Sequence, residues 1–552
     1  MWRYWKIIIS FIVLAPLFFF LGAVSSKLDI SHQTVIESAK LIGLEFSQAE
    51  RDSMLAGLEA NRQSYQKIRE TTIPNGLPPA LNFNPIPQGM KLEKEQQAIE
   101  LLARKIAVPQ NFEELAFYSV RDLGELIRTR KITSLQLTKM YLDRLKKFDA
   151  KLHCVVSITE ELAMRQAQRA DDEIAAGNYR SPLHGIPYGA KDLLSVKGYK
   201  TTWGAMPYKD QVIDANATVI TKLEEAGAVL VAKLTLGALA WGDVWYDGKT
   251  RNPWNIEQGS SGSSAGPSSA TAAGLVAFSI GSETWGSIVS PSTRCGNTGL
   301  RPTYGRVSRT GAMALSWSMD KIGPICRSVE DCALVFQAII GEDGLDQTLV
   351  DVPFNYNHEI DLKKLKIGYV KSAFESDYDN KKTDLSTLEK LRDLGAELVP
   401  IELPDLPIRS LSFILSAEAA AAFDDLTRSN KDDLLVRQIK NAWPNVFRTS
   451  RFIPAVEYIQ ANRLRYRAIQ EMHKILQEVD LYIAPSFIGN NLLLTNLTGH
   501  PSVVLPNGFN SKNSPVSITF MGKLYDEATL LAVAKKYQDA TDFHLQYPPA
   551  FN

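Results

Sequence analysis

Two segments rich in glycine and serine carry the residues best suited to chemistry. Residues 262–269 contain Ser263 among small neighbours, and residues 281–287 end in a Trp-Gly-Ser turn at Ser287. Small residues beside a serine let backbone N–H groups approach a substrate atom closely. Acyl transfer needs this arrangement, because a hydroxyl must attack beside N–H groups that face the developing oxyanion. The two segments therefore indicate a serine-dependent acyl-transfer site.

Other interpretations of the first segment fit the chain less well. Residues 262–266 match the G-x-S-x-G nucleophile elbow with Ser264 as nucleophile, but that elbow follows a hydrophobic strand. Residues 250–258 are polar and interrupted by Pro253, so a strand does not readily form there. A phosphate-binding loop is disfavoured because the G-x-x-x-x-G-K-[ST] pattern is missing. A flexible Gly/Ser linker does not lead into an apolar run, here 275–280, and a second glycine turn. We therefore interpret the two segments as halves of one site.

A serine nucleophile needs a base, and no histidine lies near either segment in the sequence. A lysine that burial keeps neutral can act as the base instead. Lys191 stands at the mouth of a short apolar run and is the candidate. A lysine chosen without further information is most often a solvated surface residue, so this assignment needs independent support.

Several motifs occur in an order that resembles the amidase signature family, over about residues 115–545. The pattern N-P-W-x(8)-S runs from Asn252 to Ser263 without a gap. Residues 281–291 resemble the family's G-T-D-T-G-G-S-I-R-x-P block, residues 295–308 match closely, and residues 496–501 resemble its N-x-x-G-x-P turn. The resemblance implies an α/β fold with a central mixed β-sheet covered by helices on both faces.

Carried onto this sequence, the resemblance implies a Ser–Ser–Lys triad. Ser287 is expected to be the nucleophile that forms the acyl-enzyme, Ser263, on a cis peptide bond, to relay the proton, and Lys191 to be the neutral base. The oxyanion hole is expected from the backbone N–H groups of Thr284, Trp285 and Gly286. No metal ligand and no cofactor-binding residue is implied.

Trp285 replaces the first glycine of the family's Gly-Gly-Ser turn. Only its backbone N–H is needed for catalysis, so the departure affects specificity more than chemistry. The indole either narrows the acyl pocket or fills the space behind the turn, and the sequence leaves both open.

The implied reaction is hydrolysis of a small linear carboxylic amide to a carboxylate and an amine or ammonia. One alternative is the glutaminase (A) subunit of a tRNA-dependent amidotransferase, and another is a membrane-tethered amidase-like binding protein that has lost catalysis. The chain has 61 basic and 61 acidic residues, so its net charge gives no reason to expect a nucleic-acid partner. The sequence does not indicate the oligomeric state.

The elements that must position these residues follow an alternating pattern. Helices are predicted at 120–128, 134–148, 160–175, 218–226, 385–394 and 456–479. Short apolar runs that indicate buried strands lie at 229–232, 275–280, 365–370, 398–401, 480–484 and 502–505. Such alternation indicates an α/β sheet with helices on both faces, as the family resemblance also implies.

The N-terminal part differs in composition. Arg3 and Lys6 precede an apolar stretch at 7–24, which is typical of a signal peptide and just long enough to span a bilayer. We expect residues 1–26 to be a signal peptide or membrane anchor, and the protein to be exported (periplasmic or secreted) or anchored by residues 7–24. Residues 27–110 are predicted to be a helical extension, with helices at 33–44 and 48–68 and a Pro-rich linker at 73–89. Residues 111–548 form the predicted amidase domain.

The four cysteines show no metal-ligand spacing and no C-x-x-C motif. Because exported proteins form disulfides, a Cys326–Cys332 bridge is conceivable. Four buried, unpaired cysteines are the favoured interpretation.

Overall fold

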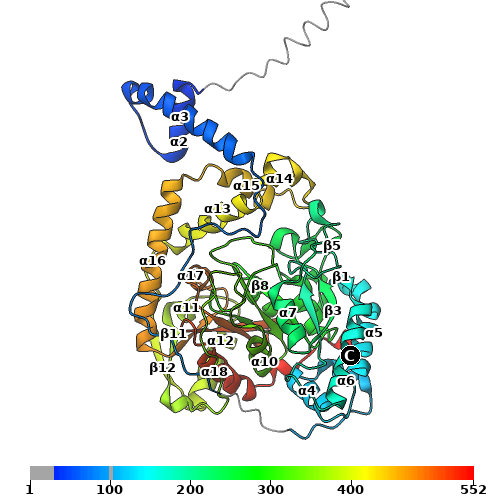
Figure 1. Cartoon of the computed structure of the whole chain (residues 1–552). Helices are drawn as coiled ribbons and strands as arrows, with labels where there is room; N and C mark the ends of the chain where they lie inside the picture. The colour runs from blue at the N-terminus through cyan, green and yellow to red at the C-terminus, as the bar shows by residue number, and fades with distance from the viewer. Residues whose placement is uncertain (1–29, 98–103) are drawn as a thin grey trace, which may run out of the picture. The chain divides into compact units, whose positions relative to one another are not determined.

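The computed structural model describes residues 30–97 and 104–552 (Figure 1). It divides into two units, Met1–Pro74 and Asn75–Asn552. The signal peptide or anchor predicted at 1–26 lies outside the described residues. Within the described ranges, none of the helices combines the length and the apolar character that crossing a bilayer requires.

The described part of the first unit contains two helices, α2 (His32–Ile42) and α3 (Gln48–Arg69). Ser31 and Ser47 cap their first turns, and each takes part in a capping box with the residue three positions on. Such caps satisfy backbone N–H groups that have no partner inside the helix. Both helices lie where the sequence predicts them.

An eleven-stranded mixed sheet forms the centre of the second unit, in the order β1-β3-β2-β8-β10-β9-β14-β15-β13-β11-β12. Its strands are β1 (Val155–Ile158), β2 (Pro187–Lys191), β3 (Val229–Leu234), β8 (Phe278–Glu283), β9 (Thr298–Arg301), β10 (Lys321–Cys326), β11 (Lys366–Val370), β12 (Glu397–Ile401), β13 (Leu481–Pro485), β14 (Ser502–Phe509) and β15 (Pro515–Gly522). β2 pairs in parallel with β3 and β8, and β11 pairs in parallel with β12 and β13. The other pairs are antiparallel, so the predicted mixed sheet is confirmed.

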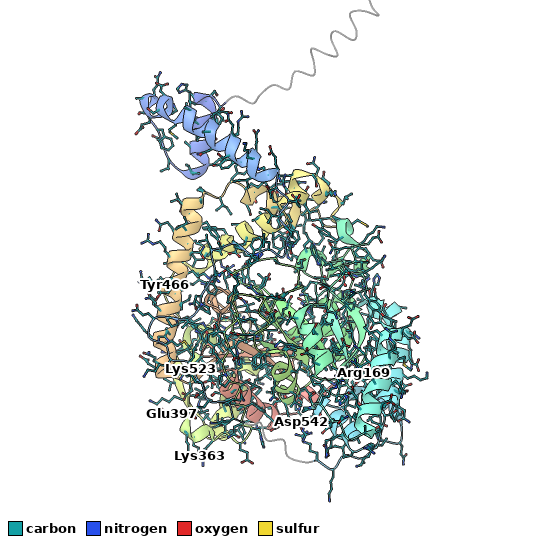
Figure 2. All side chains as sticks on the ribbon, viewed as in Figure 1. Arg169, Lys363, Glu397, Tyr466, Lys523 and Asp542 are labelled. Atoms are coloured by element: carbon teal, nitrogen blue, oxygen red, sulfur yellow. The ribbon has the colours of Figure 1, made fainter. Side chains whose placement is uncertain are left out.

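Helices pack on this sheet and surround it (Figure 1). They are α4 (Val120–Arg128), α5 (Ser134–Leu152), α6 (Glu160–Ala175), α7 (Thr218–Glu225), α8 (Ala265–Ala272), α9 (Val289–Cys295), α10 (Val329–Ile339), α11 (Lys371–Glu375), α12 (Lys381–Asp393), α13 (Phe413–Ala422), α14 (Asp424–Arg428), α15 (Trp443–Ser450), α16 (Ala455–Glu478), α17 (Asn491–Thr498) and α18 (Glu527–Asp539). Helices α16 and α6 form opposite flanks, and Figure 2 shows Tyr466 on α16 and Arg169 on α6 projecting outward. The two segments that carry Ser263 and Ser287 lie between these flanks, around β8.

The apolar run predicted as a strand at 275–280 is shifted in the structure. Leu275 donates a backbone hydrogen bond of 2.9 Å to the carbonyl of Ala270, which closes the end of α8. Residues 275–277 therefore belong to a turn, and β8 begins only at Phe278.

A strand also forms where none is expected from the sequence. β6 (Arg251–Asn252) and β7 (Asn255–Gly259) make a small hairpin, and the Asn252 side chain accepts a 3.0 Å hydrogen bond from the Trp254 N–H in its turn. The expectation that a strand does not readily form at residues 250–258 was therefore wrong, because the turn closed by the Asn252 side chain lets the chain reverse at Pro253 and Trp254. β7 pairs only with β6 and stays outside the main sheet, so it is not the buried strand that a nucleophile elbow requires.

All four cysteines are buried and unpaired. The favoured interpretation of the cysteines is confirmed, and the Cys326–Cys332 bridge is not formed.

Candidate active site

Lys191 is the last residue of β2, and its side chain is fully buried. Its Nζ donates to three serine hydroxyls, those of Ser263 at 2.9 Å, Ser264 at 3.0 Å and Ser282 at 2.9 Å. Among the residues that the structure describes, no carboxylate lies within ion-pair distance of this Nζ. The Ser282 carbonyl also accepts a hydrogen bond from this Nζ, at 3.3 Å, so the lysine is surrounded by neutral acceptors.

This environment changes the protonation of Lys191. Burial disfavours the ammonium form and lowers the pKa of Lys191 from 10.5 to about 7, although the Asp320 and Glu283 carboxylates oppose the change from a distance. A lysine with such a pKa is neutral in a large fraction of molecules near pH 7. It can therefore accept a proton from a hydroxyl that it contacts.

Ser263 lies at the start of the segment that leads into α8. Its peptide bond with Gly262 is cis, as the family resemblance implies. A Cβ on Gly262 would lie 1.9 Å from the carbonyl oxygen of Gly242, so only glycine fits this close approach of two backbones. The tight packing fixes the position of the Ser263 hydroxyl, which is 1 % exposed.

Ser287 lies in the turn between β8 and α9, and its side chain is 8 % exposed. The two serine-containing segments are joined here, because the backbone N–H of Ser264 donates to the Ser287 carbonyl at 3.1 Å. No hydrogen bond joins the hydroxyls of Ser263 and Ser287 in the described part of the chain. Such contacts often tighten only when a substrate is bound.

A buried carboxylate holds this turn in place. Glu283 accepts hydrogen bonds from the N–H groups of Ile288 at 2.8 Å and Val289 at 3.0 Å. Its other oxygen accepts from Arg301 and Asn496, both at 2.8 Å. Burial raises the pKa of Glu283, but Arg301 and the hydrogen bonds outweigh it and lower the pKa to about 2. The carboxylate is therefore charged, and it fixes the backbone on the far side of Ser287.

The expected oxyanion turn, residues 284–286, combines features that suit an anion. Gly286 has φ of +83°, a conformation that glycine adopts readily. Within the described residues, the N–H groups of Trp285 and Gly286 have no hydrogen-bond acceptor, which leaves them available to a ligand. The indole of Trp285 is 40 % exposed. Both roles expected of the indole, narrowing an acyl pocket and filling the space behind the turn, stay predictions.

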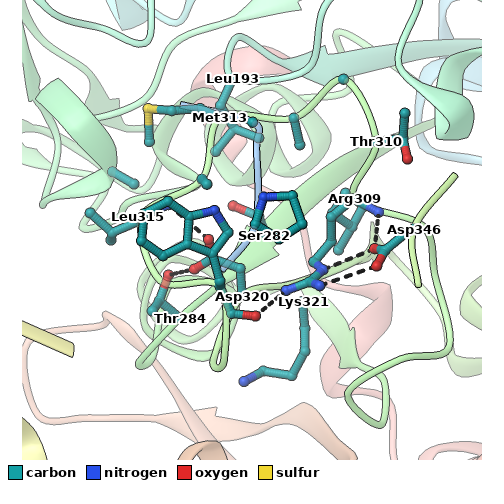
Figure 3. Close-up of a pocket in the computed structure, with 18 of the residues that line it drawn as sticks. Leu193, Ser282, Thr284, Arg309, Thr310, Met313, Leu315, Asp320, Lys321 and Asp346 are labelled. Carbon is teal, nitrogen blue, oxygen red and sulfur yellow. Dashed lines mark hydrogen bonds and ion pairs between the residues drawn. The ribbon is translucent and has the colours of Figure 1, made fainter. Parts of the chain in front are cut away.

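A cavity of about 190 Å³ begins at Thr284 and lies next to the expected triad, whose three residues are not part of its lining (Figure 3). Ser282 and Thr284 contribute to its wall. Figure 3 shows Leu193 and Met313 on one side of it and Arg309 with Asp346 on another. The Arg309 guanidinium forms two hydrogen bonds to Asp346, at 3.0 and 3.2 Å, so its charge is neutralised. Asp320 and Lys321 also line the cavity, where Asp320 accepts from the Thr284 hydroxyl and Lys321 donates to the Met319 carbonyl. Because each charged group has a partner within the protein, the cavity suits an uncharged group.

The structure brings Lys191 and Ser263 into direct contact. Ser287 is joined to this pair through Ser264, whose N–H donates to the Ser287 carbonyl. Sequence reasoning missed Ser264 and Ser282 as partners of Lys191, and Glu283 as the residue that fixes the turn. The signal for Glu283 was present, because a charged residue at the end of an apolar strand needs a partner. The signal for Ser282 was not, because neighbouring hydroxyls in such a segment look alike.

The described residues contain no cluster of three or more His, Cys, Asp or Glu side chains suited to a metal ion. The groups that the described residues gather at this site are the lysine amine, the serine hydroxyls and the backbone N–H groups.

The sequence profile of the family described as Amidase matches residues 136–494. The A subunit of glutamyl-tRNA(Gln) amidotransferase from Marinomonas sp. (strain MWYL1) is 33% identical, over 78% of this chain and 98% of that protein. The native peptide amidase from Stenotrophomonas maltophilia is 27% identical with a TM-score of 0.72, covering 80% of this chain and 100% of that one. An amidase family protein from Bacillus anthracis str. Ames is 28% identical with a TM-score of 0.70, covering 79% and 93%.

Proposed function

The chain belongs to the amidase family, and we propose that it hydrolyses a linear carboxylic amide to a carboxylate and an amine or ammonia through a Ser–Ser–Lys triad. Amidase-signature enzymes are hydrolases that act on carbon–nitrogen bonds, and this coarser assignment follows from family membership. The triad, the linear amide and the small-molecule substrate are the proposed refinements.

In the first half of the reaction, the Ser287 hydroxyl oxygen attacks the amide carbonyl carbon. Its proton passes to the Ser263 oxygen, while the Ser263 proton passes to the neutral Nζ of Lys191. The N–H groups of residues 284–286 receive the oxyanion, an interaction worth about 3 kcal/mol per donor in comparable sites. The proton then returns through Ser263 to the amide nitrogen, the carbon–nitrogen bond breaks, and an ester on Ser287 remains.

In the second half, water attacks the ester carbonyl and gives its proton to the same Ser263–Lys191 relay. The tetrahedral intermediate expels the Ser287 oxygen, which recovers the proton. The products are a carboxylic acid, which ionises, and the free enzyme. No step needs a group beyond the residues already described.

The observation that carries this proposal is the environment of Lys191. The Lys191 amine is buried among three serine hydroxyls, no carboxylate of the described residues pairs with it, and its pKa is lowered to about 7. A structural lysine gains nothing from this arrangement, since burial of an unpaired charge is costly. A base that must be neutral gains its function from it.

The nucleophile is tested with a fluorophosphonate probe, which forms a covalent bond with an activated serine. We expect the wild-type chain to be labelled and Ser287→Ala to lose both labelling and amide hydrolysis. Ser290→Ala is the matched control, because Ser290 is a partly exposed serine three residues away that we place outside the triad. Labelling of Ser287→Ala at the wild-type rate would overturn the assignment of Ser287.

A second candidate is a glutaminase component of an amidotransferase, favoured by the 33% identity to such a protein, almost all of which is covered. Assay of the purified chain alone separates the two. Hydrolysis of simple apolar amides without added protein supports a free-standing amidase. Activity restricted to glutamine, and seen only with partner proteins, supports the alternative.

Export or membrane anchoring through residues 7–24 remains a proposal that rests on sequence alone. A catalytically silent, membrane-tethered binding protein is also tested by the fluorophosphonate experiment, because such a protein is not labelled.

A further inference from the structure

The cavity beside the catalytic residues has a wall from a distant part of the chain. Gly76 and Pro78 line it together with Ser282 and Thr284. These two residues belong to an extended segment, residues 75–92, which we call the strap. The strap lies within the second unit, and Figure 1 shows it as the dark blue chain that runs past α13 and α16.

Asn75 holds the first part of the strap in place. Its side-chain oxygen accepts from the Ala314 N–H at 2.8 Å, and its side-chain nitrogen donates to the Ala314 carbonyl at 2.9 Å. The same nitrogen donates to the Ala422 carbonyl at 3.2 Å. One carboxamide thus pairs with the backbone of Ala314 as a neighbouring strand does. Ala314 itself lines the cavity, so the anchor and the wall are directly connected.

Further contacts fix the strap beyond the cavity. The Phe83 ring packs edge-on against Tyr304, with centroids 5.0 Å apart, and the Arg465 guanidinium lies 3.6 Å from its centroid. Pro85 and Pro87 are buried. These contacts hold the strap against the rest of the second unit independently of Asn75. Loss of the Asn75 side chain therefore frees mainly residues 75–80.

The chemistry of the cavity indicates what the wall encloses. Leu193, Met313 and Leu315 contribute apolar surface. The charged lining residues have partners within the protein: Arg309 pairs with Asp346, Asp320 accepts from Thr284, and Lys321 donates to the Met319 carbonyl. At about 190 Å³ the space is small, and the strap supplies part of its lining. The family profile begins only at residue 136, so this wall lies outside the matched region.

We propose that the strap is a fixed wall of the substrate pocket, that Asn75 is its positioning residue, and that together they select amides whose apolar, uncharged substituent is short. This inference rests on the proposed amide hydrolysis. It adds the substrate class and names the part of the chain that sets the length limit.

The first test needs no turnover. Gly76→Cys is made in the whole chain with Ser287→Ala, and the rate of alkylation by N-ethylmaleimide is measured with and without butyryl para-nitroanilide. A Cβ at residue 76 meets no neighbour within 4 Å, and the four native cysteines are buried, so the new thiol is the reactive one among the described residues. At saturation we expect alkylation to slow by about tenfold.

Gly57→Cys on α3 is the matched control, since this position is also exposed and a Cβ there is unhindered. Its alkylation rate should be the same with and without butyryl para-nitroanilide. If Gly76→Cys is not protected, or if both cysteines are protected equally, the strap is not a wall of the ligand site and the inference is overturned.

The second test measures selectivity with two series of amides, one lengthened on the acyl side and one on the amine side. In Asn75→Ala, we expect kcat/KM for the long member relative to the short member of one series to rise by at least about tenfold, because the wall can yield. Asn355→Ala is the matched control. Its side chain also holds the extension, at Gln97 (2.8 Å) and Glu95 (2.8 Å), but lies outside the cavity wall.

We expect the Asn355→Ala ratio to stay at the wild-type value. An unchanged ratio in Asn75→Ala for both series would overturn the inference. If the wild type hydrolyses no amide of either series, the proposed amide hydrolysis fails, while the cysteine protection still decides whether the strap is a wall.

Discussion

Lys191 and Lys233 lie near the ends of two neighbouring parallel strands, β2 and β3, yet their surroundings differ. Both side chains are fully buried. Lys233 forms an ion pair of 2.7 Å with the buried Asp192, whereas Lys191 contacts three serine hydroxyls. Burial lowers the pKa of both, but at Lys233 the adjacent carboxylate directly opposes this. Burial alone therefore does not make a base, and the lack of a paired anion matters as much.

The largest contrast is expected from removing each ammonium. We expect Lys191→Met to lower kcat/KM by about 10²–10⁴-fold, the usual contribution of a positioned base, with little change in thermal stability. Lys233→Met leaves the Asp192 carboxylate buried without its partner, so we expect the free energy of unfolding to fall by about 3–5 kcal/mol. Steady-state kinetics and thermal denaturation measure the two effects.

The contrast between the two lysines is wrong if Lys191→Met mainly lowers the free energy of unfolding and Lys233→Met mainly lowers kcat/KM. Asp192→Asn combined with Lys233→Met is the control, because it removes both charges together. It should destabilise the protein less than Lys233→Met alone.

The pH dependence of activity should report Lys191 alone. Its pKa is about 7 and the neutral form is the base, so kcat/KM should rise as pH increases through about 7. Lys191→Met should lack this step in its residual activity, whereas Asp192→Asn should keep it. A wild-type profile that is flat between pH 6 and pH 8, both within about one unit of that pKa, would remove Lys191 as the base.

The same pKa affects stability. Between about pH 7 and pH 10.5 the unfolded chain holds a proton on Lys191 that the folded chain has lost. Raising pH through this window should therefore stabilise the wild type relative to Lys191→Met. Below pH 7 both states are protonated, so the difference between the two proteins becomes constant. Urea unfolding at several pH values measures this.

The smallest effects are expected from Ser264 and Ser282, the two serines outside the proposed triad that contact the lysine. The Ser264 hydroxyl also donates to the Ser282 carbonyl and accepts from the Ser282 N–H, both at 3.1 Å. Ser264→Ala or Ser282→Ala removes one hydrogen bond to Nζ, worth about 0.5–1.5 kcal/mol, so kcat/KM should fall by about two- to tenfold. The lost acceptor stabilised the ammonium, so the step in the pH profile should move to lower pH. Ser269→Ala is the control, because Ser269 is buried on α8, the helix that follows Ser264, and its hydroxyl donates to the Arg251 carbonyl instead of contacting Lys191. A step that moves to higher pH would contradict this account.

The sequence by itself determined much of this protein. The serine turns and the amidase resemblance identified Lys191, Ser263 and Ser287 as the candidate triad, and the local sequence pattern predicted helices α2, α3, α7 and α16. These signals are local, because a cap, a turn or a helix face depends on residues within a few positions. The strands at 229–232 and 398–401 were likewise readable from short apolar runs.

Only the tertiary structure decided how these parts meet. β2 contains Pro187 and Gly189, shows no alternation, and was not predicted; it forms because β3 and β8 flank it in parallel. That pairing sets Ala190 opposite Ile280 and so brings Lys191 to Ser282, 91 residues away. Asn75 reaches Ala314 across 239 residues in the same way. Local patterns do not encode which distant strand or strap becomes a neighbour, because that choice depends on the packing of the whole sheet.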